Sequence, residues 1–227
     1  MVFPGPLQRA GGKPKAMSTY DTAFRLGVTA GLWIAWCVVH SLLATESLVR
    51  KSGILDSRIG PFYRLIFSLF AVLSLILVSV LTPHGDELTL WTWEGSLRLL
   101  QIALWLVALT VAWLSFRIIG IGRMLGFCAL GICKKDASEP DVLITWGIYG
   151  VLRHPQFTAG LVLLWSRDLT DTGLVINAVL SLYLIIGAHI EESRLLAKYG
   201  EEYLKYKASV PGFVPNSLSS VRALLQK

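Results

Sequence analysis

The sequence predicts an all-α, polytopic membrane protein, and three features of the chain support this fold class. Of its 227 residues, 54% are hydrophobic and only 16% are charged, and the mean hydropathy is +0.59. A soluble domain usually carries about 25% charged residues, so the missing charge is typical of a chain solvated by lipid. Several apolar runs also approach the roughly 20 residues that a helix needs to cross a hydrocarbon core about 30 Å thick.

About five transmembrane helices are expected. Three apolar runs are long enough to span a membrane: 23–43, 62–81 and 97–118. A fourth run begins after Pro155 and is interrupted at Ser166–Asp168, so we expect it to tilt or to reach only part of the way across. A fifth runs from Leu174 to Ile190 and continues into a charged segment. The last two runs together predict a helical hairpin with a polar turn at 167–172.

The chain divides into four regions. Residues 1–20 lack the apolar segment of a signal peptide and are interpreted as a disordered tail. Residues 21–114 hold the first transmembrane helices, 115–215 hold the C-terminal hairpin with its flanking segments, and 216–227 form a C-terminal tail.

The distribution of basic residues predicts the orientation. With five spans, the segments that follow the first, third and fifth helices share one side, and 15 of the 21 Lys and Arg residues fall there against 6 on the other side. The excess of Lys and Arg marks the cytoplasmic side. The opposite loop, 83–95, contains Asp86, Glu87 and Glu94 without a Lys or Arg. We therefore expect the N-terminus outside and the C-terminus inside.

Three other classes of site receive little support. The formal charge of +6 comes from basic residues that flank apolar runs, which does not favour nucleic-acid binding. The three cysteines lack metal-site spacing and are interpreted as packing residues without a disulfide framework, and no metal site is predicted. The glycines of 120–126 have the wrong spacing for a dinucleotide fingerprint and favour a helix end that permits close packing.

Two polar clusters near the ends of the hairpin are candidates for chemistry. The first is 147–157, which contains Arg153, His154 and Pro155, and the second is 189–192 at the end of the last helix. Both fall on the predicted cytoplasmic side and flank the same hairpin, so they can meet. Pro155 suits the first turn of a helix, which would put Arg153 and His154 beside free backbone donors able to hold an anion. The alternative is that Arg153 extends to lipid phosphates and Glu191 pairs along its helix with Arg194 or Lys198.

Four separated motifs carry a family resemblance. In chain order they are Leu143–Tyr149, Arg153–Pro155, Glu191–Glu192, and Gly200–Tyr206 followed by Val210–Pro211. Together they resemble the isoprenylcysteine carboxyl methyltransferase superfamily over roughly 115–215. The earlier segments 40–44 and 62–67 resemble its methanethiol S-methyltransferase branch, a front half that is shared with the haem-containing zeta-carotene isomerase.

The resemblance implies a cytoplasmic S-adenosylmethionine pocket formed by the C-terminal hairpin and its flanking segments. Its cofactor-binding residues would be Asp141, Val142, Leu143, Ile144, Tyr149, His154, Pro155, Gln156, Phe157 and Glu191. The candidate catalytic residues are His154, Tyr149 and Arg153, and no single base is assigned among them.

Two departures from the family pattern bear on the acceptor. Phe157 stands where the family usually has Tyr, which removes a hydroxyl. Gly187 stands where the prenylcysteine enzymes have an Arg that engages the substrate carboxylate. Without that Arg, a small hydrophobic acceptor such as methanethiol is favoured, methylated on sulfur to a thioether.

A membrane methyltransferase for such a thiol is therefore the predicted function, with the bilayer and a small hydrophobic substrate as partners. Methyl transfer to a thiolate needs little acid–base machinery, because positioning and the exclusion of water supply most of the rate. Two alternatives stay open: a haem protein related to the isomerase, with His40, His154 or His189 as ligands, and a non-catalytic membrane scaffold. The oligomeric state is not predicted.

Overall fold

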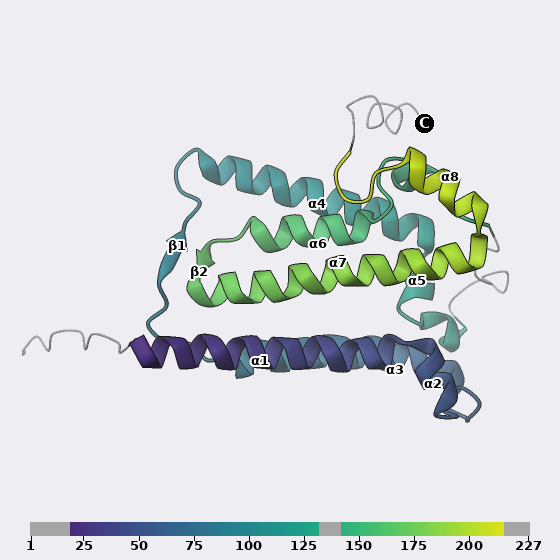
Figure 1. The fold of residues 1–227 in the computed structure, drawn as a ribbon, viewed down its shortest axis with the longest axis horizontal. Coiled ribbons are helices and arrows are strands. Elements are labelled where there is room, and N and C mark those ends of the chain that lie inside the picture. Colours follow the sequence, from purple (N-terminus) through teal and green to yellow (C-terminus); the bar gives the residue numbers. More distant parts are fainter. Residues whose placement is uncertain (1–18, 132–141, 216–227) are drawn as a thin grey trace, which may run out of the picture.

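A computed structural model describes residues 19–131 and 142–215, and it consists of long helices that run lengthwise beside one another (Figure 1). Four helices of the described chain are long and apolar enough to cross a membrane. They are α1 (Thr19–Ala44), α3 (Tyr63–Leu81), α4 (Leu97–Ile119) and α7 (Asp171–Tyr199). α1 packs against α3 and α7, and α4 packs against α6 (Pro155–Trp165). The predicted all-α polytopic fold class is confirmed.

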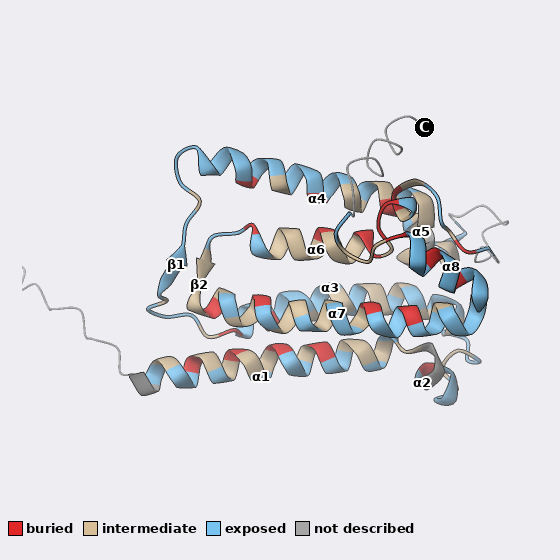
Figure 2. Cartoon of the chain, turned by 45° about the horizontal axis from the view of Figure 1, so that its top comes forward, coloured by how far each residue is buried: buried red, intermediate tan, exposed pale blue. Residues whose placement is uncertain are grey.

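The helix surfaces are the reverse of those in a soluble protein. Leu99 and Leu106 of α4 are 72% and 60% exposed, whereas Ala108 and Ser115 on the same helix are at most 1% exposed (Figure 2). Lipid solvates the large apolar side chains as well as a protein core does, so small residues occupy the positions where helices touch. The outward-facing leucines therefore fit a helix surrounded by acyl chains.

The helix α6 is the short member of the hairpin. It has 11 residues and begins with Pro155 in its first turn, as the sequence predicts. At 1.5 Å per residue it is about 16 Å long, roughly half of a hydrocarbon core. The chain then passes through the strand β2 (Leu169–Thr170) into α7, whose first turn is capped by the Thr170 hydroxyl.

The end of the bundle that holds the two short strands is called the strand end. Backbone pairing and an ion pair join the helices there. The strand β1 (Thr89–Trp91) lies antiparallel to β2. The Arg25 guanidinium on α1 lies 2.6 Å from the Asp171 carboxylate at the start of α7 and also donates to the Thr172 hydroxyl. This contact fixes the beginning of α1 against the hairpin.

The opposite end holds the short helices and the motifs at 143–155 and 191–211, and it is called the motif end. The short helices are α2 (Glu46–Lys51), η1 (Gly60–Phe62), α5 (Ile121–Met124), η2 (Phe127–Leu130), η3 (Gly147–Gly150) and α8 (Glu201–Ser209). Gly126 has φ of 84°, and a Cβ built there would lie 2.3 Å from the Leu65 backbone nitrogen. The expectation of close packing is thus confirmed at Gly126, whereas Gly120, which ends α4, would have nothing within 4 Å of its Cβ.

The cysteines differ from the expectation in one case. Cys37 is free and buried in α1, as expected for a packing cysteine. Cys128 in η2 is disulfide-bonded, so the expectation that the cysteines only pack is wrong there. Spacing alone does not report on disulfide bonding, because a disulfide depends on the distance and orientation of two cysteines in the folded chain. The expected tails, 1–20 and 216–227, lie almost entirely outside the described residues.

Candidate functional site

The two polar clusters meet at the motif end around Glu192. Arg153, in the turn before α6, donates from Nε and Nη2 to Glu192 Oε1 at 3.0 and 2.7 Å. His154 Nε2 lies 3.0 Å from the same oxygen, and Lys207 Nζ donates to Glu192 Oε2 at 2.7 Å. Three basic side chains from two segments of the chain, 153–154 and α8, therefore converge on one carboxylate of α7.

The segment after α8 closes over this cluster. The backbone N–H groups of Arg153 and His154 donate to the carbonyls of Pro211 and Gly212 at 2.9 and 3.1 Å. Arg153 Nη1 also donates to the Val210 carbonyl at 2.6 Å. The backbone N–H groups of Arg153 and His154 are therefore occupied by the chain itself. The anion beside Arg153 and His154 is Glu192 of the chain itself.

His154 is the most enclosed ionisable residue of the cluster. Its side chain is 2% exposed and lies between the rings of Phe157 and Phe213, whose centroids are 5.7 and 5.4 Å away. Nδ1 lies 3.4 Å from Glu191 Oε2, but the geometry does not make a hydrogen bond and Nδ1 has no hydrogen-bond partner. Burial lowers the pKa of His154, yet its contacts with Glu191 and Glu192 outweigh burial and raise that pKa above its ordinary value.

The two adjacent glutamates take different roles. Glu191 is 52% exposed, whereas the Glu192 side chain is 11% exposed and paired with three cations. Sequence reasoning singled out Glu191 and missed both Glu192 and Lys207. Helix periodicity carries a signal for Glu192, because Ala188 lies one turn earlier on the same buried face of α7. Arg153 is only 14% exposed, which argues against its extension to lipid phosphates.

The segment before η3 is held in place by α8. Leu143 packs with Tyr203, Tyr206 and Val210 in a small buried core. Tyr206 also donates from its hydroxyl to the Tyr149 carbonyl at 2.6 Å. This packing explains the Gly200–Tyr206 motif in physical terms, since its tyrosines fix the position of residues 143–149. Val142 is 69% exposed and Ile144 is half-buried, while Asp141 lies outside the described residues.

The remaining predicted site residues line the start of α6 and η3. The Tyr149 hydroxyl lies 2.5 Å from Ser115 Oγ, and burial raises the pKa of Tyr149 to about 12. Such a phenol stays protonated at neutral pH, which makes it a hydrogen-bond partner and a poor base. Gln156 Nε2 lies 3.8 Å from Met124 Sδ, and Pro155 is buried at the first helical position.

Of the three catalytic candidates, Arg153 is the least available to a substrate. Its Nε, Nη1 and Nη2 atoms all donate to groups of the chain. We therefore regard Arg153 as a positioning residue that ties the turn before α6 to α7. His154 Nδ1 makes no hydrogen bond but lies 3.4 Å from Oε2 of the half-exposed Glu191.

The histidines considered as haem ligands lie in separate surroundings. His40 Nδ1 lies 2.7 Å from the Tyr183 hydroxyl, and the Nδ1 atom of His189 lies 2.8 Å from the Ile185 carbonyl. The described part of the chain holds no group of three or more His, Cys, Asp or Glu side chains arranged to bind a metal ion.

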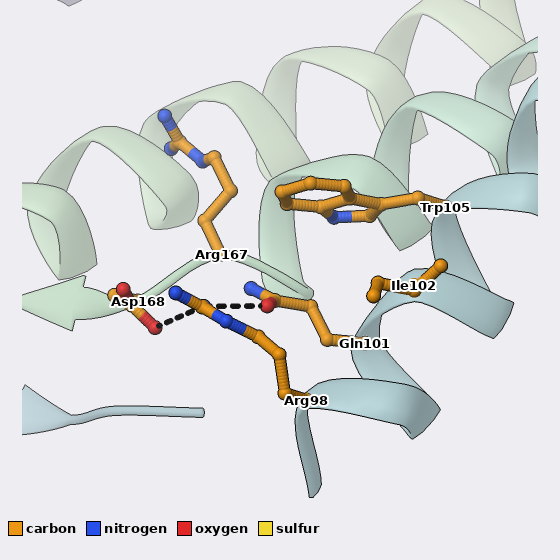
Figure 3. A pocket seen from close by; sticks show the side chains of 6 residues that line it. All are labelled: Arg98, Gln101, Ile102, Trp105, Arg167 and Asp168. Carbon is orange, nitrogen blue, oxygen red and sulfur yellow. Dashed lines mark hydrogen bonds and ion pairs between the residues drawn. The ribbon is translucent and has the colours of Figure 1, made fainter. Parts of the chain in front are cut away.

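A cavity of about 600 Å³ lies at the strand end, and no predicted site residue lines it. Figure 3 shows the side chains around it. The cavity is lined by Arg98, Gln101, Ile102, Trp105, Arg167 and Asp168. Arg98 lies 3.7 Å from Asp168, and Arg167 donates to Asn177 at 2.8 Å. These charged groups are paired across the hairpin turn, so the cavity is a feature of the turn and not of the motif cluster.

Comparison with known proteins places the motif cluster in a family context. Methanethiol S-methyltransferase 1 of Bradyrhizobium diazoefficiens is 26% identical over 215 residues, covering 89% of this chain and 72% of that protein. A methanethiol S-methyltransferase of a Pseudomonas species is 27% identical over 208 residues, covering 83% of this chain and 78% of that protein. Protein-S-isoprenylcysteine O-methyltransferase of Xenopus laevis is 28% identical over 124 residues, or 46% of this chain and 42% of that protein.

These relatives confirm the resemblance drawn from the four motifs, because both methyltransferase branches are similar to the chain. No family model and no solved structure matches it.

Proposed function

We propose that this chain, a membrane methyltransferase related to the methanethiol S-methyltransferases, transfers the methyl group of S-adenosylmethionine to a small hydrophobic thiol. The observation that carries the proposal is the cluster at the motif end, where Arg153 donates to Glu192 and to the Val210 carbonyl and so joins three of the four family motifs in one site. The acceptor class follows from the relatives and from the absence of a side chain at Gly187.

The residues of the motif end fit the charges of the proposed cofactor, which supplies a methyl group activated on a sulfonium. The amino-acid part of that molecule carries a carboxylate and an ammonium group. The raised pKa of His154 suits a carboxylate, and Glu191, which is half-exposed and lies 3.4 Å from His154 Nδ1, suits an ammonium. The exposed Val142 and the Phe157 ring would supply apolar contacts.

The chain's own contribution to the reaction is positioning and the exclusion of water. Burial at the motif end and the apolar helix faces keep water from the reacting sulfur, which strips hydration from a thiolate. Holding two reacting atoms near contact distance supplies a large share of the rate. A carboxylate acceptor would meet a large desolvation cost beside Gly187, since no cation stands at that position.

The decisive experiment compares acceptors with the purified chain in one detergent. Labelled S-adenosylmethionine is supplied with methanethiol, with a farnesylcysteine analogue or with phospholipid. We expect methanethiol to be turned over fastest, with a rate that rises with pH toward the pKa of the thiol, because only the thiolate is a strong nucleophile. Faster turnover of the farnesylcysteine analogue would overturn the thiol assignment.

The proposed orientation puts the motif end in the cytoplasm, on the basis of the 15 against 6 split of Lys and Arg. Single cysteines introduced at Lys205 and Asp86 probe the two ends, in a background where Cys37, Cys128 and Cys133 are replaced. We expect an impermeant thiol reagent to label position 86 but not position 205 in intact cells. Labelling of position 205 from outside would reverse the orientation.

A further inference from the structure

A groove of about 400 Å³ lies between α1 and α7, within the spans that cross the membrane. Its rim is apolar and open to the lipid, since Val38, Leu42, Leu182 and Ile186 are each more than half exposed. Its inner wall carries polar groups. There the groove is lined by the buried Cys37 and by the hydroxyl-bearing Ser41 and Tyr183. The groove is thus apolar where it opens and polar where it ends.

The polar wall continues into a hydrogen-bonded pair. Tyr183 Oη lies 2.7 Å from His40 Nδ1 and accepts a second contact from Ser41 Oγ at 3.3 Å. The His40 ring is fixed by Trp36 and Phe67, each with its centroid 5.1 Å away. Ionisable groups at membrane depth are costly, and they are retained mainly where they serve a function.

The titratable groups around this pair come from three helices. They are Cys37 and His40 on α1, Tyr63 on α3 and Tyr183 on α7. The Tyr63 hydroxyl is engaged elsewhere, because it donates to the Leu43 carbonyl at 2.7 Å. Tyr183 lines the groove and is hydrogen-bonded to His40, so this pair offers the groove a proton acceptor.

One face of α7 connects the groove to the motif end. Tyr183, Gly187 and Glu191 follow one another at intervals of four residues, so each lies about 6 Å along the helix from the last. A Cβ at Gly187 would lie 3.9 Å from Cζ of Phe157, whose ring stacks on His154. The position without a side chain thus lies between the tyrosine of the groove and the proposed cofactor site.

We infer that this groove binds the thiol acceptor and that Tyr183 and His40 remove its proton. The inference rests on the proposed function and adds the acceptor site and the base. The thiol S–H bond breaks and its proton passes to Tyr183 Oη, while the phenolic proton moves to His40 Nδ1. The thiolate forms its new bond to the methyl carbon as the carbon–sulfur bond of the sulfonium breaks, giving a neutral thioether. The imidazolium then releases its proton to water.

The test uses the full chain with Tyr183→Phe and His40→Gln, and with Tyr63→Phe as the matched control. Tyr63→Phe also removes one phenolic hydroxyl from the bundle, but that hydroxyl does not line the groove. The first measurement needs no cofactor. 4-Nitrothiophenol is bound at a pH below its solution pKa, and the visible absorbance of its thiolate is recorded. We expect bound thiolate in the wild type and in Tyr63→Phe, and bound neutral thiol in the other two variants.

The second measurement is turnover. General-base catalysis contributes typically 10²–10⁴-fold, so kcat for methanethiol should fall by about 10²-fold or more in Tyr183→Phe and His40→Gln. The dissociation constant for S-adenosylmethionine should stay unchanged in both variants. Leu182→Trp alters only the lipid-exposed rim and should raise KM for methanethiol, which keeps the groove testable if an inner variant fails to fold.

The outcomes separate the two proposals. Wild-type protein that methylates no thiol would overturn the proposed function, and the acceptor groove with it. Wild-type turnover together with unchanged kcat and unchanged thiolate absorbance in both inner variants would overturn the base alone. An unchanged KM in Leu182→Trp would overturn the groove as the acceptor site.

Discussion

The two ends of the helical bundle both bury charged residues, but they use them differently. At the strand end, Arg25 of α1 pairs with Asp171 of α7, one cation with one anion, at 2.6 Å. At the motif end, Glu192 alone meets Arg153, His154 and Lys207. In the first arrangement, the charge of Arg25 is neutralised by the charge of Asp171. The second gathers basic groups around one carboxylate and leaves a further carboxylate, Glu191, 52% exposed beside them.

This difference is what we would expect between a structural contact and the proposed binding site. An unpartnered nitrogen does not distinguish the ends by itself, because Arg25 Nε and His154 Nδ1 are both buried without a partner. The distinguishing feature is the further pair that His154 forms with Glu191 at the motif end, because the Glu191 side chain of this pair is 52% exposed. Such a pair matches an amino acid group, which carries both charges.

The largest effect is expected from Glu192→Gln. Removing one partner of a buried ion pair leaves the other charge uncompensated and typically costs about 3–5 kcal/mol. Arg153 is 14% exposed and would lose its acid, so we expect the free energy of unfolding to fall by about that much. Denaturation in mixed micelles measures the change. A free energy within about 1 kcal/mol of the wild type would mean that the cluster is not a stabilising centre.

Glu191→Gln is the matched control one residue away. Its side chain is half-exposed, so we expect the free energy of unfolding to change by no more than about 0.5 kcal/mol. The affinity for S-adenosylmethionine should instead weaken by about 1–3 kcal/mol, the value of one hydrogen bond to a charged group. Calorimetry that finds wild-type affinity in the folded variant would remove Glu191 from the proposed site.

A smaller and purely structural effect is expected from Asp171→Asn at the strand end. Arg25 would keep a neutral acceptor but lose its counter-charge, and we expect a loss of about 2–3 kcal/mol in the free energy of unfolding. Asp168→Asn is the control, because Asp168 and Arg98 are about half exposed and such pairs contribute about 1 kcal/mol or less. Neither variant should change cofactor affinity. A change in that affinity would erase the distinction between the two ends.

Much of this architecture is readable from the sequence, because it depends on local patterns. The apolar runs predict the spans, Pro155 predicts the start of α6, and Gly126 predicts a close approach of two backbones. The meeting of 153–155 with 191–192 also follows from topology, since both segments flank one hairpin.

What the sequence does not predict depends on helix rotation and on long-range contacts. Glu191 and Glu192 are neighbours in the chain but lie about 100° apart around α7, so one is exposed and the other is buried. The pairing of His40 with Tyr183 joins residues 143 positions apart, so no local sequence pattern predicts it. The same holds for Lys207, which reaches Glu192 only after α8 turns back toward the hairpin.

The smallest expected effect is a pH dependence that originates at His154. Burial lowers the pKa of His154, but Glu191 and Glu192 raise it by more than burial lowers it, so the net shift of this pKa is upward. A raised pKa in the folded state stabilises the protein fully below the unfolded value of about 6.5, and this stability is lost as the pH rises through the folded value. We therefore expect the wild-type Tm to fall as the pH rises above about 6.5.

In His154→Gln, whose amide can still donate to Glu192, this part of the decline should be absent. All other titrating groups are common to the two proteins, so the difference between the two pH profiles reports His154 alone. Superimposable profiles would show that its ring carries no extra charge in the folded state, and the motif end would then lack the cation proposed to receive the cofactor's carboxylate.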